Sequence, residues 1–150
     1  MADRLDRPFQ EWHRLGGAVL LARADENLPV RKPEEIVAES TAHCRESGRL
    51  TWVVLDWLMR HIDEIDVGRL LAETRQKGSL PVLGVLADAA RARRPHRKFD
   101  RIVAGCEPND TAEPFFYRVA SSPLASRLAH ENALEVFRRW NFYSNELHYL

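Results

Sequence analysis

Six basic residues are concentrated within eleven positions of the chain, between residues 91 and 101. They are Arg91, Arg93, Arg94, Arg97, Lys98 and Arg101. Asp100 is the one acid among them, whereas the whole chain is neutral, with 22 basic and 22 acidic residues, so the rest of the chain is acidic. Guanidinium and ammonium groups bind carboxylates and phosphates. This basic stretch is therefore a candidate binding site for an acidic protein surface or for phosphate groups.

A structural role accounts for part of the same charge. Pro95 should end a helix predicted over residues 80–94, so the first three arginines of the stretch fall in its last turn, where cations offset the helix dipole. The cations beyond Pro95 then lie on the solvated face of a following helix at about residues 96–105. Phe99 is the single aromatic residue among the charges, which gives little support for stacking on exposed bases. The structural role and the binding role both stay open.

Arg91 and His96 raise a catalytic alternative. Four residues separate them, and this spacing resembles the motif of HEPN-type ribonucleases, helical domains in which an arginine precedes a histidine by a few residues. The resemblance implies that the two side chains act on a scissile phosphate. The chain also contains a comparable pair at Arg7 and His13, and such pairs arise by chance in a sequence this rich in arginine. Pro95 interrupts the helical register that would bring Arg91 and His96 together.

Large aromatic side chains gather near the end of the sequence, beside two arginines. The candidates for contact with a partner there are Arg138, Arg139, Trp140, Phe142 and Tyr143, and Phe137 and Tyr149 add to the aromatic content. Chain ends fray unless they are tied down, so this concentration indicates that the segment docks. It docks either on the protein's own core or on a partner, because Trp, Tyr and Arg are enriched among the residues that dominate binding at interfaces.

Metal and covalent chemistry find little support in the sequence. The acids between residues 56 and 66 are explained by helix pairing and capping, since Asp56 precedes Arg60 by four residues and Asp66 precedes a predicted helix. The six histidines show no paired metal-ligand spacing, and the two cysteines form no CxxC motif. We therefore expect no metal, no cofactor and reduced thiols.

The elements that would position all these residues are helices. Residues 49–65 carry apolar side chains across an arc of about 200°, the pattern of a central core helix. Strand signals are weak, although residues 111–120 are compatible with a strand that has no evident partner. The predicted fold class is thus all-α: one multi-helix domain of about six helices, compatible with stacked helical hairpins, with a linker-like segment at residues 25–33. The other predicted helices cover residues 6–12, 33–47, 67–77, 80–94, 96–105 and 122–140.

No segment reaches the ~18–20 apolar residues of a membrane span, and the first residues lack the apolar centre of a signal peptide. These features predict a cytoplasmic location and no membrane partner. We interpret the chain as a small, non-enzymatic protein-interaction or regulatory module, of the kind of an antitoxin that inhibits a partner protein. The alternatives are a nucleic-acid-binding domain that uses residues 91–101 and the ribonuclease-like or phosphoryl-transfer enzyme; a homo-oligomer is compatible with each.

Overall fold

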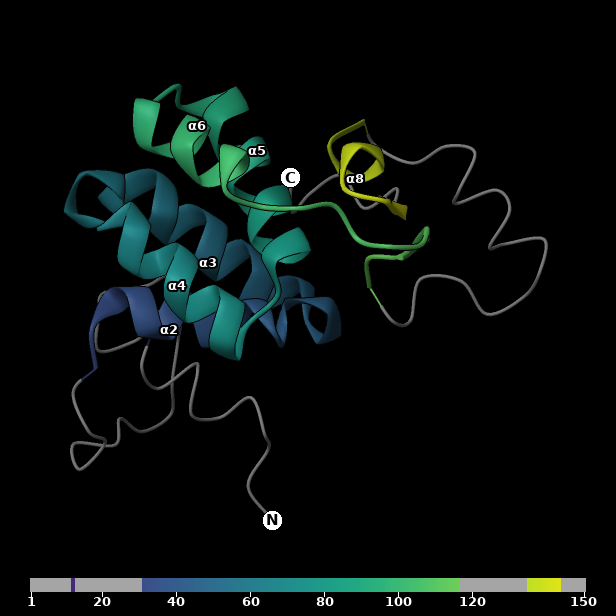
Figure 1. The fold of residues 1–150 in the computed structure, drawn as a ribbon, viewed down its shortest axis with the longest axis horizontal. Coiled ribbons are helices and arrows are strands. Elements are labelled where there is room, and N and C mark those ends of the chain that lie inside the picture. Colours follow the sequence, from purple (N-terminus) through teal and green to yellow (C-terminus); the bar gives the residue numbers. More distant parts are fainter. Residues whose placement is uncertain (1–11, 13–30, 117–134, 144–150) are drawn as a thin grey trace, which may run out of the picture.

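The computed structural model describes Trp12, residues 31–116 and residues 135–143. These residues form a mostly helical body, which confirms the all-α prediction (Figure 1). Apart from Trp12 and residues 31–33, the helix predicted over residues 6–12, the linker-like segment and the first part of the helix predicted over residues 122–140 lie outside the described residues. The α-helices of the described part are α2 (Pro33–Thr41), α3 (Gly48–His61), α4 (Val67–Lys77), α5 (Leu80–Arg93), α6 (Arg97–Ala104) and α8 (Glu135–Arg139).

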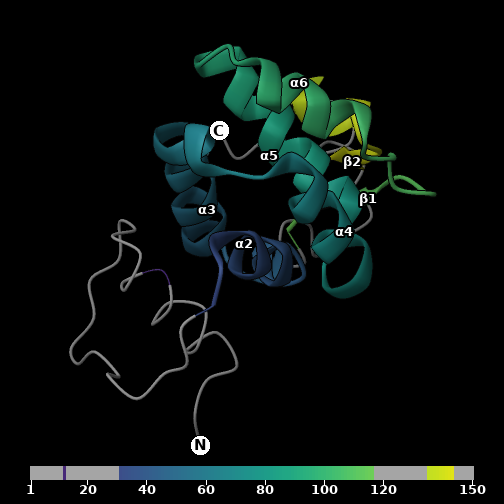
Figure 2. The ribbon, with the colours of Figure 1, turned by 60° about the vertical axis from the view of Figure 1, so that its left-hand side comes forward.

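The helices α2 and α6 lie at opposite ends of the body, and α3, α4 and α5 connect them (Figures 1 and 2). As predicted, α3 is a core helix that buries Leu50, Val54 and Leu58 completely. On α5, every residue from 82 to 90 is buried, so this helix is covered on all sides. Both α3, with its wide apolar arc, and α5, with its short apolar run, pack against neighbouring elements on most of their surface. This burial explains why few of their positions carry polar side chains.

Several predicted helix boundaries are confirmed. Pro33 begins α2, where its fixed φ suits a first helical position. The carboxylate of Asp66 accepts the N–H of Arg69 at 3.0 Å and starts α4. The hydroxyl of Ser79 accepts the N–H of Val82 at 3.3 Å and starts α5. These caps satisfy amide groups that have no partner inside their own helix.

One predicted boundary is wrong. The helix that starts at Pro33 was expected to run to about residue 47 and to end at Gly48, but α2 ends at Thr41, and Gly48 is the first residue of α3. A 3₁₀ turn (Cys44–Glu46) lies between the two helices. The hydroxyl of Ser47 caps α3 by accepting the N–H of Leu50 at 3.1 Å. A serine just before the glycine therefore starts a new helix here.

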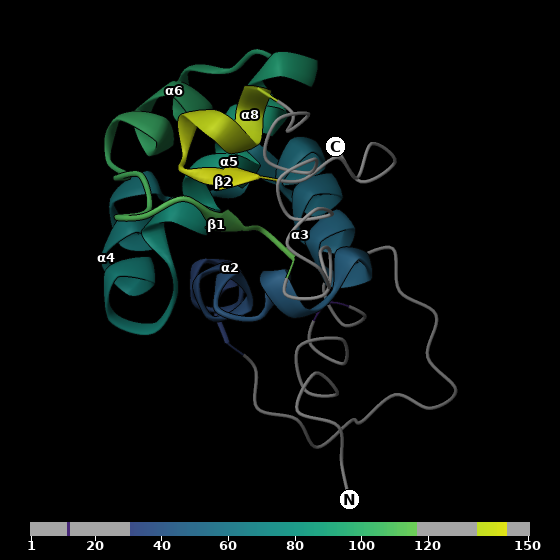
Figure 3. The same ribbon diagram turned by 90° about the vertical axis from the view of Figure 1, so that its right-hand side faces the viewer.

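The ambiguous segment at residues 111–120 contains a short strand. β1 (Glu113–Pro114) pairs in parallel with β2 (Phe142–Tyr143), which follows α8 (Figure 3). The sequence showed no partner for this segment, because the partner is a two-residue strand nearly thirty residues later. Asn141, at φ 60°, turns the chain from α8 into β2 in the left-handed conformation that asparagine tolerates.

Arg45, in the 3₁₀ turn before α3, fastens this ladder to the helical body. Its Nε donates to the carbonyl oxygen of Phe115 at 2.9 Å, and its guanidinium also donates to the carbonyl oxygen of Pro114 at 2.7 Å. The same guanidinium reaches the carboxylate of Glu113 at 3.0 Å and lies 5.0 Å from the ring centre of Phe142. One side chain thus contacts both strands.

Candidate interaction surface

The turn between α5 and α6 lies against the end of α3 and uses part of the basic stretch to do so. Nζ of Lys98 donates to the carbonyl oxygens of Asp63 and Ile65, at 2.8 Å each. The guanidinium of Arg94 donates to the carbonyl oxygen of Met59 in the last turn of α3. The last carbonyls of a helix lack partners within it, so Arg94 caps the last turn of α3 and offsets its dipole. Lys98 caps the 3₁₀ turn (Ile62–Glu64) that follows α3.

His96 begins α6 and contributes to the same contact. Its Nδ1 accepts the N–H of Lys98 at 3.0 Å, so Nε2 carries the proton and donates to the carboxylate of Asp63 at 2.8 Å. This hydrogen bond, together with the positive charges of Arg94 and Lys98, holds the pKa of Asp63 below its ordinary value. Asp63 is therefore the shared acceptor of the α5–α6 turn.

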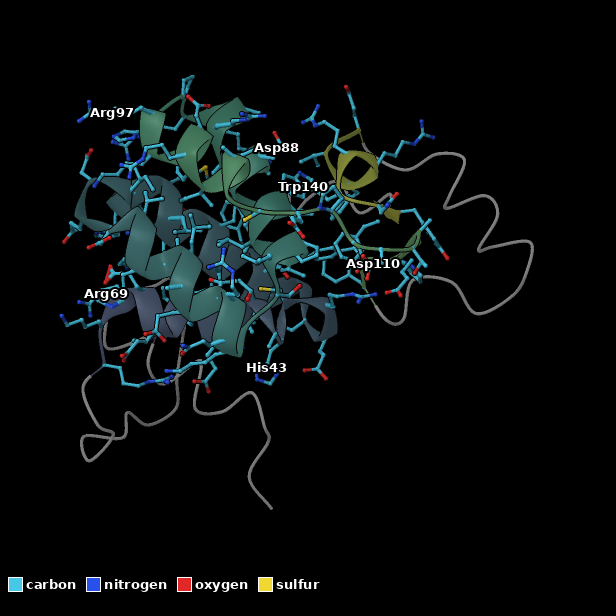
Figure 4. All side chains as sticks on the ribbon, viewed as in Figure 1. His43, Arg69, Asp88, Arg97, Asp110 and Trp140 are labelled. Atoms are coloured by element: carbon cyan, nitrogen blue, oxygen red, sulfur yellow. The ribbon has the colours of Figure 1, made fainter. Side chains whose placement is uncertain are left out.

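Asp88 is a buried carboxylate in α5 that receives three donors. Nε of Arg91 donates to one oxygen at 3.0 Å, while Nε of Arg139 and Nε1 of Trp140 donate to the other at 2.8 and 3.0 Å. Burial alone would raise the pKa of Asp88, but the hydrogen bonds from Arg139, Trp140 and Arg91 lower it below the ordinary value. Figure 4 shows Asp88 and Trp140 on adjacent elements. The two candidate regions of the sequence, 91–101 and 138–143, thus meet at this carboxylate.

A glycine one helical turn before Asp88 makes room for the indole of Trp140. A Cβ at Gly84 would lie 2.4 Å from Cζ3 of Trp140, which is closer than any carbon contact allows. The Trp140 side chain is 5% exposed and Phe142 is buried, both against the protein's own core. For Trp140 and Phe142 the structure therefore favours docking on the protein's own core over docking on a partner. Of the other candidates at this end of the chain, Arg138 is exposed and Tyr143 is half-buried.

The three remaining arginines of the basic stretch make none of these contacts. Arg93, Arg97 and Arg101 are exposed, and no hydrogen bond or ion pair involves their side chains within the described part of the chain. Arg97 and Arg101 lie one turn apart on α6, and Figure 4 shows Arg97 projecting from the body. We call these three exposed residues, one at the end of α5 and two on α6, the arginine face.

Carboxylates accompany the arginine face. Asp63, which the α5–α6 turn contacts, has a side chain that is 70% exposed, and Asp100 on α6 is 65% exposed. Arg91 lies 3.3 Å from Asp100, so one of the cations of the stretch partly neutralises it. The surface is therefore one of mixed charge rather than a uniformly basic patch.

Among the described residues, the groups considered for catalysis are engaged in other contacts or are buried, and Arg7 and His13 lie outside the described residues. His96 and Arg91 are engaged with Asp63 and Asp88 as described above, and no interaction joins the two side chains to each other in the part of the chain that the structure covers. Burial raises the pKa of Cys44 and of Cys106 to about 12, so both thiols stay protonated at neutral pH and are poor nucleophiles. Among the described residues, no group of three or more His, Cys, Asp or Glu side chains is placed to hold a metal ion.

Sequence reasoning missed two of the residues that organise this surface. Asp88 carries the one charge in the apolar run from residue 80 to residue 90. A single acid in such a run indicates a buried carboxylate, which requires hydrogen-bond donors from elsewhere in the fold. Arg45 gave no such signal, because its partners are mainly backbone carbonyl oxygens seventy residues away.

Comparisons with protein-family models, with curated proteins and with solved structures find no match for this chain. Within the described residues, no helix combines the length and the apolar character needed to cross a bilayer.

Proposed function

We propose that this chain is a non-enzymatic helical interaction module whose arginine face docks on carboxylates of a partner protein. The observation that supports this is the division of the basic stretch. Arg91, Arg94 and Lys98 are used inside the molecule, whereas the arginine face is exposed and unpaired. Arginine is enriched at protein interfaces because its planar guanidinium binds a carboxylate through two parallel hydrogen bonds.

A protein surface suits this face better than a nucleic acid does. The exposed carboxylates of Asp63 and Asp100 would repel a continuous phosphate backbone, which binds best to uniformly positive surfaces. Phe99, the aromatic residue of the stretch, is completely buried and offers no ring to a base. A protein of mixed charge can place acids against the arginines and cations against these carboxylates, which favours specificity and fast association.

A small cytoplasmic regulator that covers a partner, as an antitoxin covers its toxin, is the class of protein that fits this arrangement. The ribonuclease-like alternative has less support, because His96 caps a helix and Arg91 is held by a buried carboxylate. The same mixed-charge surface is also suited to a second copy of the chain.

A capture experiment with a charge-matched control tests the proposal. Immobilised wild-type protein is compared with a triple variant, Arg93→Gln, Arg97→Gln and Arg101→Gln, for quantitative recovery of proteins from an extract of the source cells. The control removes three exposed cations elsewhere: Lys32→Gln, Arg69→Gln and Lys77→Gln. We expect one or a few proteins that the wild type and the control recover equally and that the arginine-face variant loses.

Two results would contradict the proposal. The first is that the arginine-face variant retains every specific partner. The second is that duplex DNA or single-stranded RNA binds the wild type tightly, with an affinity that falls steeply as salt rises, and that the arginine-face variant loses this binding. The second result would show that the arginine face binds nucleic acid, as the nucleic-acid alternative predicts.

A further inference from the structure

A groove of about 370 Å³ opens between two segments that are distant in the sequence, the α4–α5 turn and the loop after α6. One wall consists of the end of α4 and the start of α5, with Arg75, Ser79 and Leu80 among its residues. The other wall is the loop after α6, with Glu107, Asn109 and Asp110. The volume lies within the range of small-molecule sites in proteins.

Hydrogen bonds and close packing fix both walls. In the loop, the N–H of Asn109 donates to the carbonyl oxygen of Trp140 at 3.0 Å, and the side-chain amide of Asn141 donates to the carbonyl oxygen of Asn109 at 2.7 Å. In the turn between α4 and α5, a Cβ at Gly78 would lie 2.1 Å from the carbonyl oxygen of Ala38, so the turn is seated directly on α2. The groove therefore exists before any ligand arrives, which lowers the entropic cost of binding.

The charges of the groove are separated by wall. Arg75 is exposed on the helical wall, while Glu107 and Asp110 are exposed on the loop wall. None of the three has a hydrogen-bonded or ionic partner in the described part of the chain, so opposite charges face one groove without pairing to each other. The positive end of the α5 dipole lies on the same wall as Arg75 and adds to the separation.

We propose that this groove binds a small zwitterion, from the size of an amino acid to that of a dipeptide, with its carboxylate on Arg75 and its ammonium group on Glu107 and Asp110. A ligand with both charges satisfies both walls at once. A simple anion is attracted by one wall and repelled by the other, and the same holds for a simple cation, so the arrangement selects against both. The site uses no residue of the arginine face and stands independently of the proposed function.

Titration of the full-length, isotope-labelled protein followed by NMR tests the proposal. Glycine and glycylglycine are the zwitterionic probes, and acetate and methylammonium are the single-charge controls. We expect saturable shifts of the amide signals of Glu107, Asn109 and Asp110 and of the Arg75 side chain. The affinity for the better zwitterion should be about fivefold or more above that for either control. The variants Arg75→Gln and Glu107→Gln/Asp110→Asn should each weaken this binding several-fold, whereas Arg69→Gln and Glu64→Gln, at exposed sites elsewhere, should not.

The absence of saturable shifts with either zwitterion would overturn the proposal. Equal affinity for acetate and glycine would also overturn it, because the site would then be a simple anion site. Binding that survives Arg75→Gln unchanged would place the ligand outside the groove.

Discussion

The indole nitrogen of Trp140 donates a hydrogen bond to the carboxylate of Asp88 at 3.0 Å, across 52 residues of sequence. Arg139 donates to the same oxygen and Arg91 to the other. This carboxylate therefore holds α8 on α5 and restrains the first arginine of the basic stretch. Phe137, Trp140 and Phe142, three of the aromatic residues concentrated near the end of the sequence, thus pack in the protein's own core.

Removing the negative charge of Asp88 should loosen α8. In Asp88→Asn, an amide NH₂, which cannot accept a hydrogen bond, replaces one of the two acceptor oxygens and faces N–H donors. The charge-assisted hydrogen bonds from Arg139 and Trp140 are therefore weakened or lost. We expect the free energy of unfolding to fall by about 1.5–3 kcal/mol, the usual contribution of hydrogen bonds to charged groups. Urea unfolding monitored by tryptophan fluorescence measures this. Asp100→Asn, at an exposed carboxylate, is the control and should cost less than about 1 kcal/mol.

The stability of the protein should decrease in acid. Asp88, Asp63 and Glu113 have pKa values below their ordinary ones in the folded state. Groups of this kind contribute stability above their unfolded pKa, which is about 4 for these residues, and the contribution is lost as the pH falls through the folded pKa. We therefore expect the urea concentration at the unfolding midpoint to stay nearly constant from neutral pH down to about pH 5 and to decrease between about pH 5 and pH 3. Asp88→Asn should flatten the decrease, and parallel curves for wild type and variant would contradict the role given to Asp88.

Two glycines in helices should respond to alanine in opposite directions. Gly→Ala within a helix usually stabilises by up to about 1 kcal/mol. At Gly68 the nearest neighbour of the new Cβ would be Oδ1 of Asp66, at an ordinary 3.5 Å, so Gly68→Ala should stabilise the protein. At Gly84 the new Cβ would collide with the ring of Trp140, so Gly84→Ala should destabilise it and shift the tryptophan emission. Stabilisation by both substitutions would show that Trp140 does not lie against α5.

Arg45 should not tolerate replacement by lysine. A single ammonium group cannot reproduce donation to the carbonyl oxygens of Phe115 and Pro114 together with contact to the carboxylate of Glu113. We expect Arg45→Lys to destabilise the protein by about 1–2 kcal/mol and to increase amide hydrogen exchange in β1. Arg69→Lys, at an exposed position on α4, provides the comparison and should change stability by less than about 0.5 kcal/mol. Equal effects of the two variants would rule out the fastening role of Arg45.

The helical skeleton could be predicted from local signals. Apolar periodicity identified α3, and Asp66, Ser79 and Pro33 marked helix starts because capping depends on residues only a few positions apart. The same rules failed at Gly48, where a glycine is compatible with either the end of one helix or the beginning of the next, and the serine before it decides.

The organisation of the surface could not be predicted in the same way. The contact of Lys98 with the 3₁₀ turn after α3 depends on the path of the chain through α4 and α5. The hydrogen bond from Trp140 to Asp88 depends on how α8 packs. Periodicity and composition contain no information on such long-range contacts. The sequence therefore divided the six cations at Pro95, whereas the structure divides them into an inward group and the arginine face.

Equilibrium unfolding of two triple variants tests this division most directly. One variant neutralises the inward group (Arg91→Gln, Arg94→Gln and Lys98→Gln), and the other neutralises the arginine face (Arg93→Gln, Arg97→Gln and Arg101→Gln). Both lose three positive charges from the same stretch, so they differ only in the contacts removed. We predict that the inward variant loses about 2–4 kcal/mol of unfolding free energy and that the arginine-face variant loses less than about 1 kcal/mol. Equal losses, or a larger loss for the arginine face, would contradict the account.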